Sequence, residues 1–286
     1  MSKRLSWFIV LMMVLGYLFL YSPIVSLVIF SFNASKLVTV WGGFSTAWYT
    51  ALMNDTQVIT AFLLSLKIAV LSSTVATILG TVAGYVLARF GLFRGRTVLS
   101  GMVTAPLVMP EVITGLSMLL LFVEGQSLLS QYWGFEWLKN RGFVTITIAH
   151  ITFTMSYISV VMQSRFSTLD ISLEEAAQDL GAKPLKVFFV ITLPIVAPAI
   201  VSGWLLGFTI SIDDLVITSF TSGPGANTLP MVIFSKVRLG LNPEINALAT
   251  LIISVVAVGV VVSTVYMARA EKRRQRDVQM AIQAND

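Results

Sequence analysis

Cysteine is absent from this sequence, histidine occurs once, and charged residues are scarce. Only 12% of the 286 residues are Asp, Glu, Lys or Arg, against about 25% in an ordinary soluble domain. Hydrophobic residues make up 56% of the chain. Together these features exclude intrinsic disorder, a disulfide scaffold, a thiolate metal site and cysteine catalysis.

The few charged residues lie outside six long apolar windows. Apart from Glu111, no Asp, Glu, Lys or Arg occurs in residues 7–30, 68–88, 97–123, 142–164, 187–212 and 245–268. Each window reaches the roughly 20 residues that a helix needs to cross a bilayer, and a helix satisfies its own backbone hydrogen bonds there. We therefore predict an all-α polytopic membrane protein with a single transmembrane domain, 1–286. Its six helices have approximate spans at 7–30, 62–88, 97–123, 142–164, 191–214 and 245–268.

The basic residues indicate how these helices are oriented. If the N-terminus is cytoplasmic, 13 of the 19 Lys and Arg residues fall on the cytoplasmic side, five of them within 269–276. An excess of Lys and Arg marks the cytoplasmic face of a membrane protein. We predict that both termini are cytoplasmic and that the basic tail anchors the last helix, so the positive net charge is no sign of nucleic-acid binding.

Proline and glycine mark places where the simple pattern of crossings changes. Residues 215–235 are uncharged but rich in turn-forming residues, so we expect a re-entrant or surface-lying segment there rather than a seventh helix. Pro106 and Pro110 are expected to kink or interrupt the third span. Gly80 and Gly84 form a G-x-x-x-G pattern, which lets neighbouring helices approach closely.

The loop at 168–190 has more structure than a simple turn between crossings requires. Ser172 and Glu175 match a capping box that begins a helix, and Gly181 stands where that helix would end in the left-handed conformation. Pro184 suits the first turn of a second short helix. Such a pair favours a docking element, with a helix lying on the membrane as the alternative. The predicted apolar face consists of Leu173, Ala176, Ala177 and Leu180, and the polar face of Glu174, Glu175, Gln178 and Asp179.

At these residues the sequence resembles the permease subunits of bacterial ABC importers. Glu175-Ala176-Ala177, three residues, Gly181, nine residues and Ile191-Thr192-Leu193-Pro194 are similar to the EAA signature of that family. The resemblance implies a type I ABC importer permease (MetI-like) fold whose cytoplasmic loop inserts coupling helices into a separate ATPase. The coupling residues would be Glu175, Ala176, Ala177 and Gly181.

A phosphate-binding G-x-x-x-x-G-K-[ST] loop is missing from the sequence. We therefore predict that the chain is not an enzyme, has no catalytic residues and binds no cofactor. ATP and Mg²⁺ would bind to the partner ATPase.

The resemblance extends over nearly the whole chain and points to the polyamine branch of the family. The stretches that carry it are 174–194, Ser202-Gly203-Trp204-Leu205-Leu206, Asp213-Asp214-Leu215 and 240–250, which look most like a putrescine transporter permease. The resemblance implies a heterodimer with a paralogous permease subunit, a cytoplasmic ATPase dimer and an extracytoplasmic polyamine-binding protein. It also implies a place in the bacterial inner membrane.

Ionisable residues at membrane depth are the candidates for the substrate pathway, because charge there is costly and often functional. Three of the four, Glu111, Asp213 and Asp214, are acidic, the sign that suits a protonated diamine. We predict that one of the two aspartates lines the pathway while the other caps or pairs with a neighbouring helix. Glu111 has two possible roles. It either binds the diamine, or it is a structural carboxylate that the helix dipole stabilises at the N-terminus of a helix restarting after Pro110. His150 is expected to be neutral and bonded to a neighbour, and no metal site accompanies it.

Other functions stay open on the sequence alone. The permease could carry a different solute, such as spermidine, another amine, ferric iron or thiosulfate. A membrane-embedded enzyme would need a catalytic pair, for which only His150 is available, and a passive channel would have no use for the docking loop. Putrescine is not distinguished from spermidine, nor is the aspartate that faces the pathway.

Overall fold

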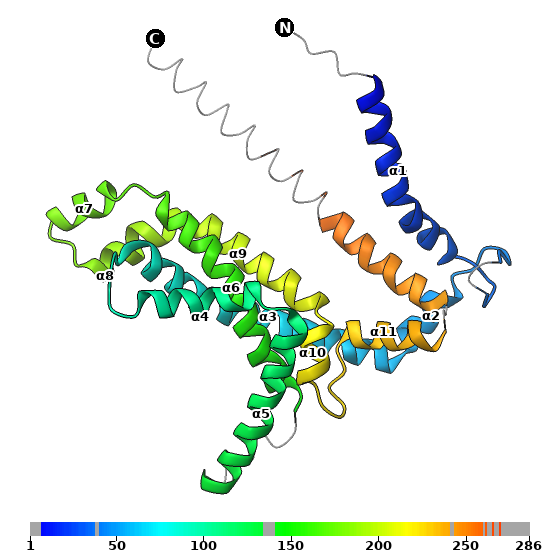
Figure 1. The fold of residues 1–286 in the computed structure, drawn as a ribbon. Helices are drawn as coiled ribbons and strands as arrows, with labels where there is room; N and C mark the ends of the chain where they lie inside the picture. Colours follow the sequence, from blue (N-terminus) through cyan, green and yellow to red (C-terminus); the bar gives the residue numbers. More distant parts are fainter. Residues whose placement is uncertain are drawn as a thin grey trace. The chain divides into compact units, whose positions relative to one another are not determined.

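The computed structural model describes residues 7–37, 40–133, 141–240 and 243–259, together with positions 261, 265 and 269. These residues are largely helical, and the β-structure among them is an isolated bridge between Asn33 and Phe44. The helices (Figure 1) are α1 (Trp7–Phe30), α2 (Ala47–Asn54), α3 (Thr56–Arg89), α4 (Arg96–Val108), α5 (Glu111–Trp133), α6 (Phe143–Ser167), α7 (Ser172–Asp179), α8 (Pro184–Val187), the π-helix η1 (Phe188–Thr192), α9 (Leu193–Asp213), α10 (Val216–Thr221) and α11 (Leu229–Leu239). A further apolar helix covers Pro243–Gly259.

Five of the described helices are long and apolar enough to cross a membrane. They cover Trp7–Phe30, Thr56–Arg89, Glu111–Leu128, Phe143–Ser167 and the continuous helical stretch Pro184–Asp213. These five lie at five of the six predicted spans, and the shorter helix Pro243–Gly259 lies at the sixth.

The third predicted span consists of two helices instead of one. α4 ends at Val108 and α5 begins at Glu111, with Met109 in an extended conformation between them. Pro110 causes this break, because proline disfavours the helical conformation of the residue before it and has no N–H to donate. Pro106, in contrast, lies inside α4.

The uncharged stretch 215–235 contains no helix of membrane-spanning length. It holds the six residues of α10 and the start of α11, joined through a turn in which Gly225 has a φ of +77°. The turn-forming residues therefore interrupt the helix as the sequence predicted.

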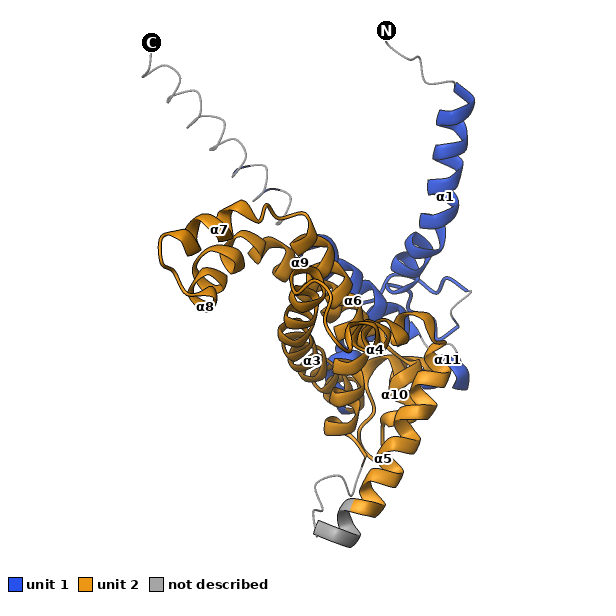
Figure 2. Ribbon diagram, turned by 60° about the vertical axis from the view of Figure 1, so that its left-hand side comes forward, with its two compact units in different colours: residues 1–56, 235–286 blue, residues 57–234 orange. Residues whose placement is uncertain are grey.

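The chain divides into two compact units (Figure 2). Unit 1 comprises residues 1–56 and 235–286 and includes an ion cluster in which the Lys236 ammonium donates to the Asp55 carboxylate and lies 3.3 Å from Glu244 Oε1. Burial alone would lower the pKa of Lys236, but these two carboxylates raise the pKa above its ordinary value.

Unit 2 comprises residues 57–234 and has its core where α3, α6 and α9 meet. Ala76 of α3, Ile158 and Met162 of α6 and Val196 of α9 are fully buried in one cluster. α3 and α6 approach closely at Gly84, where an added Cβ would lie 2.8 Å from the Met162 Cβ. The G-x-x-x-G pattern thus marks a helix contact, as expected.

Replacing Gly84 with alanine is expected to destabilise unit 2. The Ser159 carbonyl oxygen, 2.9 Å from the added Cβ, belongs to the backbone of α6 and cannot move aside alone. Overpacking of this kind costs about 1–3 kcal/mol, so thermal unfolding in detergent should begin at a lower temperature.

Gly101→Ala in α4 is the matched control, because no atom lies within 4 Å of its added Cβ. Alanine favours a helix by about 1 kcal/mol over glycine, so this variant should be at least as stable as the parent. Equal melting temperatures for the two variants would show that the close approach of α3 and α6 is not needed.

Candidate substrate cavity and coupling loop

A cavity of about 340 Å³ lies in unit 2 at the end of α9. All three acidic residues predicted for the pathway, Glu111, Asp213 and Asp214, line this cavity, and Phe153 and Tyr157 of α6 add aromatic walls. Glu111 begins α5 and Asp213 ends α9. The fold therefore brings together carboxylates from two helices that are distant in the sequence.

Asp214 is held in place by its neighbours. One of its carboxylate oxygens accepts hydrogen bonds from the Thr218 amide and hydroxyl, each 2.7 Å long, and the other accepts from the Ile217 amide at 3.3 Å. These bonds satisfy free amides at the start of α10. Asp214 Oδ2 also lies 3.3 Å from His150 Nε2, so Asp214 has the capping and pairing contacts predicted for one of the two aspartates.

Asp213 differs from Asp214 in its surroundings. Its side chain is exposed at the cavity, and no hydrogen bond or ion pair to another described residue holds the carboxylate. Of the two neighbouring aspartates, Asp213 is thus the one with a carboxylate available to a cation that enters the cavity.

His150 is buried behind the cavity and joins four helices. Its Nδ1 lies 2.7 Å from Ser211 Oγ of α9, and its Nε2 lies 2.9 Å from Thr218 Oγ1 of α10. Ser211 in turn lies 3.0 Å from Ser72 Oγ of α3. The prediction that His150 bonds to neighbours is confirmed. Its two hydroxyl partners and the link from Ser211 to Ser72 were not predicted, although small polar residues within apolar helices were the available signal.

The loop between α6 and α9 contains the two short helices that the sequence predicted. α7 and α8 begin at Ser172 and Pro184, and Gly181 has a left-handed φ of +84° between them. The predicted capping box is wrong, because Ile171 occupies the N-cap and the Ser172 amide donates to Asp170 Oδ1 at 3.0 Å. An aspartate side chain commonly accepts from the backbone N–H two residues further on, so Asp170 accepts the amide that the predicted capping box assigned to the Glu175 carboxylate. Hydrogen bonding to Ser172 lowers the pKa of Asp170.

The two faces of α7 are not arranged as the apolar pattern predicted. Leu180 is 90% exposed and Leu173 is 46% exposed, and Glu175 and Ala176 are exposed beside them. Glu174, placed by the pattern on the polar outer face, is instead 7% exposed. Its burial has a tertiary cause, since the Thr192 hydroxyl donates to Glu174 Oε1 at 3.0 Å.

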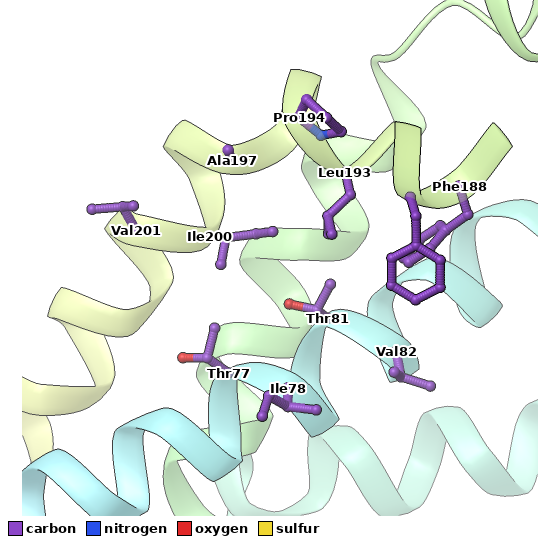
Figure 3. A pocket seen from close by; sticks show the side chains of 11 residues that line it. Thr77, Ile78, Thr81, Val82, Phe188, Leu193, Pro194, Ala197, Ile200 and Val201 are labelled. Carbon is purple, nitrogen blue, oxygen red and sulfur yellow. The ribbon is translucent and has the colours of Figure 1, made fainter. Parts of the chain in front are cut away.

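A second cavity, of about 600 Å³, lies between α3 and the start of α9 (Figure 3). The cavity is lined mainly by apolar side chains, including Ile78 and Val82 of α3 and, across from them, Phe188 and Leu193. The polar side chains in the lining, Thr77 and Thr81, have buried hydroxyls without a hydrogen-bond partner among the described residues. Next to this cavity η1 forms a π-helical turn, a feature that often marks functional sites.

Metal binding finds no support in the described part of the chain, where no three His, Cys, Asp or Glu side chains gather in a way that could hold an ion.

Comparison with known proteins agrees with this architecture. Residues 80–276 match the family described as "Binding-protein-dependent transport system inner membrane component". The chain is similar to the putrescine transport system permease protein PotI of Escherichia coli (strain K12), with 59% identity over 97% of this chain and 96% of PotI. It is also similar to the spermidine/putrescine transport system permease protein PotC of the same strain, with 38% identity over 92% of this chain and 94% of PotC.

Solved structures of ABC transporters share the fold. A bacterial alginate ABC transporter in complex with its alginate pentasaccharide-bound periplasmic protein aligns with a TM-score of 0.70 and 18% identity, over 89% of this chain and 91% of that one. The inward-facing MetNI methionine ABC transporter aligns with a TM-score of 0.56 and 15% identity, over 72% and 92% of the two chains.

These similarities confirm the predicted type I ABC importer permease (MetI-like) fold. They also agree with the prediction that the chain itself is not an enzyme, because the relatives are permease proteins. The chain belongs to the family of binding-protein-dependent transport system inner membrane components, as a permease of the ABC importer type.

Proposed function

We propose that this chain is the membrane-spanning permease subunit of an ATP-driven importer that moves polyamines, with putrescine as the main cargo, into the cytoplasm. The observation that carries the proposal is the 59% identity to the putrescine permease PotI across 97% of the chain. The acidic cavity at the end of α9 supplies a chemical reason, because putrescine is a diamine with two positive charges.

Asp213 and Glu111 are the cation-binding groups of this proposal. Both line the cavity, and their origin on different helices suits a ligand with a charge at each end. Tyr157 and Phe153 add ring faces that attract ammonium groups through cation–π contacts. Asp214, which is already bonded to α10 and His150, keeps the cavity wall in place and adds negative charge.

The proposed assembly contains three further kinds of subunit. A paralogous permease completes a heterodimer, a cytoplasmic ATPase dimer binds ATP and Mg²⁺, and an extracytoplasmic binding protein delivers the polyamine. The alginate transporter, whose structure includes a periplasmic protein, supports a binding-protein partner in general. The distribution of Lys and Arg supports cytoplasmic N- and C-termini in the inner membrane.

The coupling loop meets the ATPase through α7 and α8. Exposed Glu175, Ala176 and Leu180 offer a surface of small, apolar and acidic groups, and Gly181 makes the turn that presents it. Ala177 lies beside them, partly buried. Closure of the ATPase dimer around ATP moves this surface and drives the permease between its outward and inward openings.

Spermidine is the second candidate cargo, because PotC, a spermidine/putrescine permease, is 38% identical over most of the chain. Anions such as thiosulfate are disfavoured by three carboxylates around one cavity.

A competition experiment on putrescine uptake distinguishes these cargoes in cells that depend on this subunit. Unlabelled putrescine, and spermidine less strongly, should reduce uptake of labelled putrescine, whereas thiosulfate and ferric iron should leave it unchanged. Inhibition by thiosulfate alone would refute the polyamine assignment.

The two neighbouring aspartates should respond differently to loss of charge. Asp213→Asn is expected to reduce putrescine uptake by roughly ten- to a hundredfold, because a hydrogen bond to a charged group contributes about 1.5–3 kcal/mol. Its melting temperature in detergent should stay unchanged, since no described neighbour depends on this carboxylate.

Asp214→Asn is the matched comparison and should lower the melting temperature. It weakens the bonds to the start of α10 and leaves buried groups partly unpaired, at a cost of about 1–3 kcal/mol. Full uptake by Asp213→Asn would remove that residue from the pathway, and an unchanged melting temperature for Asp214→Asn would contradict its structural part.

The turn at Gly181 should tolerate only residues that accept a left-handed conformation. Gly181→Val is expected to abolish uptake while leaving membrane insertion intact, because a β-branched residue is strained at a φ of +84°. Gly181→Asn is the control, because asparagine visits this conformation readily and an added Cβ meets no atom within 4 Å. Uptake and co-purification of the ATPase are the readouts, and normal uptake by the valine variant would argue against the coupling turn.

A further inference from the structure

A buried charged junction connects α7 to two membrane helices. Glu174 of α7 lies with its Oε1 3.5 Å from Arg89 Nη2, at the last residue of α3. The same oxygen accepts the hydrogen bond from the Thr192 hydroxyl, at the last residue of η1. Residues from three separate helices, α3, α7 and η1, therefore meet at a single carboxylate oxygen.

Burial gives this junction its rigidity. The side chains of Arg89 and Glu174 are 11% and 9% exposed, so separating them would leave two charges with little access to water. Removing one partner of a buried ion pair is strongly destabilising, because the other charge stays uncompensated. Arg89 Nη2 also donates to the Leu169 carbonyl at 2.9 Å, which fixes the chain just before α7 to the same guanidinium.

The rest of α7 has no comparable anchor. Glu174 is the one buried residue between Ser172 and Asp179, all of which are described. The leucines at both ends of the helix are exposed, as are Glu175 and Ala176. A force applied to the exposed face of α7 therefore reaches the membrane helices chiefly through Glu174.

The start of α9 has room to respond to such a force. η1 carries Thr192 and forms a π-turn beside the apolar cavity of about 600 Å³ (Figure 3). At its other end α9 carries Asp213 in the acidic cavity. With about 1.5 Å of rise per residue, its 21 residues span roughly 30 Å between the two sites.

From this geometry we infer that Glu174, Arg89 and Thr192 form the joint that passes movement of α7 to α3 and α9. The three are positioning residues that act through the helices and do not touch the cargo. The inference deepens the proposed function and rests on it, because α7 must be the element that the ATPase moves.

The test uses the assembled transporter in liposomes, with its ATPase and binding protein, and measures putrescine uptake and ATP hydrolysis in the same sample. Glu174→Gln should lower uptake per ATP by about tenfold, a size usual for coupling between sites, while the ATPase still co-purifies. Asp179→Asn, which removes the same charge from the exposed side of α7, should leave the ratio unchanged. The reversed pair Glu174→Arg with Arg89→Glu should recover part of the coupling that each single reversal loses.

A distance measurement covers the case in which these buried variants fail to fold. The chain has no cysteine, so cysteines at Phe90 and Gln178, both exposed, give a clean spin-label pair across an otherwise unaltered junction. The label distance should be the same in the nucleotide-free and the ATP-trapped transporter. A change of distance between these states would overturn the inference, because a joint that transmits movement has to keep α3 and α7 together.

The outcomes separate this inference from the proposed function. If the ATPase does not co-purify and Gly181→Val transports normally, the coupling role of the whole loop fails. If both of those results support coupling but Glu174→Gln keeps the parental uptake per ATP, the joint alone is refuted.

Discussion

A bilayer offers no water to a polar group, and the arrangement of unit 2 depends on this constraint. Where apolar helices carry a polar side chain, the cost of burial falls if a hydrogen-bond partner is supplied, either by a carbonyl of the same helix, as for Thr154, or by another helix. His150 is the clearest case, because its two ring nitrogens contact Ser211 and Thr218, and Ser211 contacts Ser72. Four helices are thereby fixed in register around one imidazole, and the acidic cavity lies against the helix ends that this network aligns.

The same constraint explains why two adjacent aspartates have different surroundings. Neighbouring side chains on a helix point about 100° apart, so only one of them can turn toward α10 and its free amides. Asp214 does so and is satisfied by Thr218 and Ile217. Asp213 remains at the cavity without such partners among the described residues. A permease in which Asp213 binds a diamine would therefore have one carboxylate available to the cation beside a second carboxylate already bonded to α10.

The features that local chemistry determines could be predicted from the sequence. Apolar runs located the long helices, Pro110 marked the break between α4 and α5, and Gly181 marked the left-handed turn after α7. The predictions for Glu174 and for the capping box were wrong because a residue outside the local pattern determined the contact that forms. Glu174 is buried because Arg89 and Thr192 meet it there, and the periodicity of α7 carries no information about either. In the predicted capping box, the Ser172 amide was assigned to the Glu175 carboxylate, but Asp170 accepts it instead.

The acidic residues of the cavity and the contact of Glu174 with Arg89 and Thr192 both lie at helix ends. Helix ends leave backbone groups free, and carboxylates near them gain or lose partners as neighbouring segments shift. Asp214 at the start of α10 and Glu174 beside the end of η1 are each held by bonds to a second element, and α9 runs between the two places. In the inferred joint, a movement of the loop would reach the cavity along α9, which has such a contact at each end.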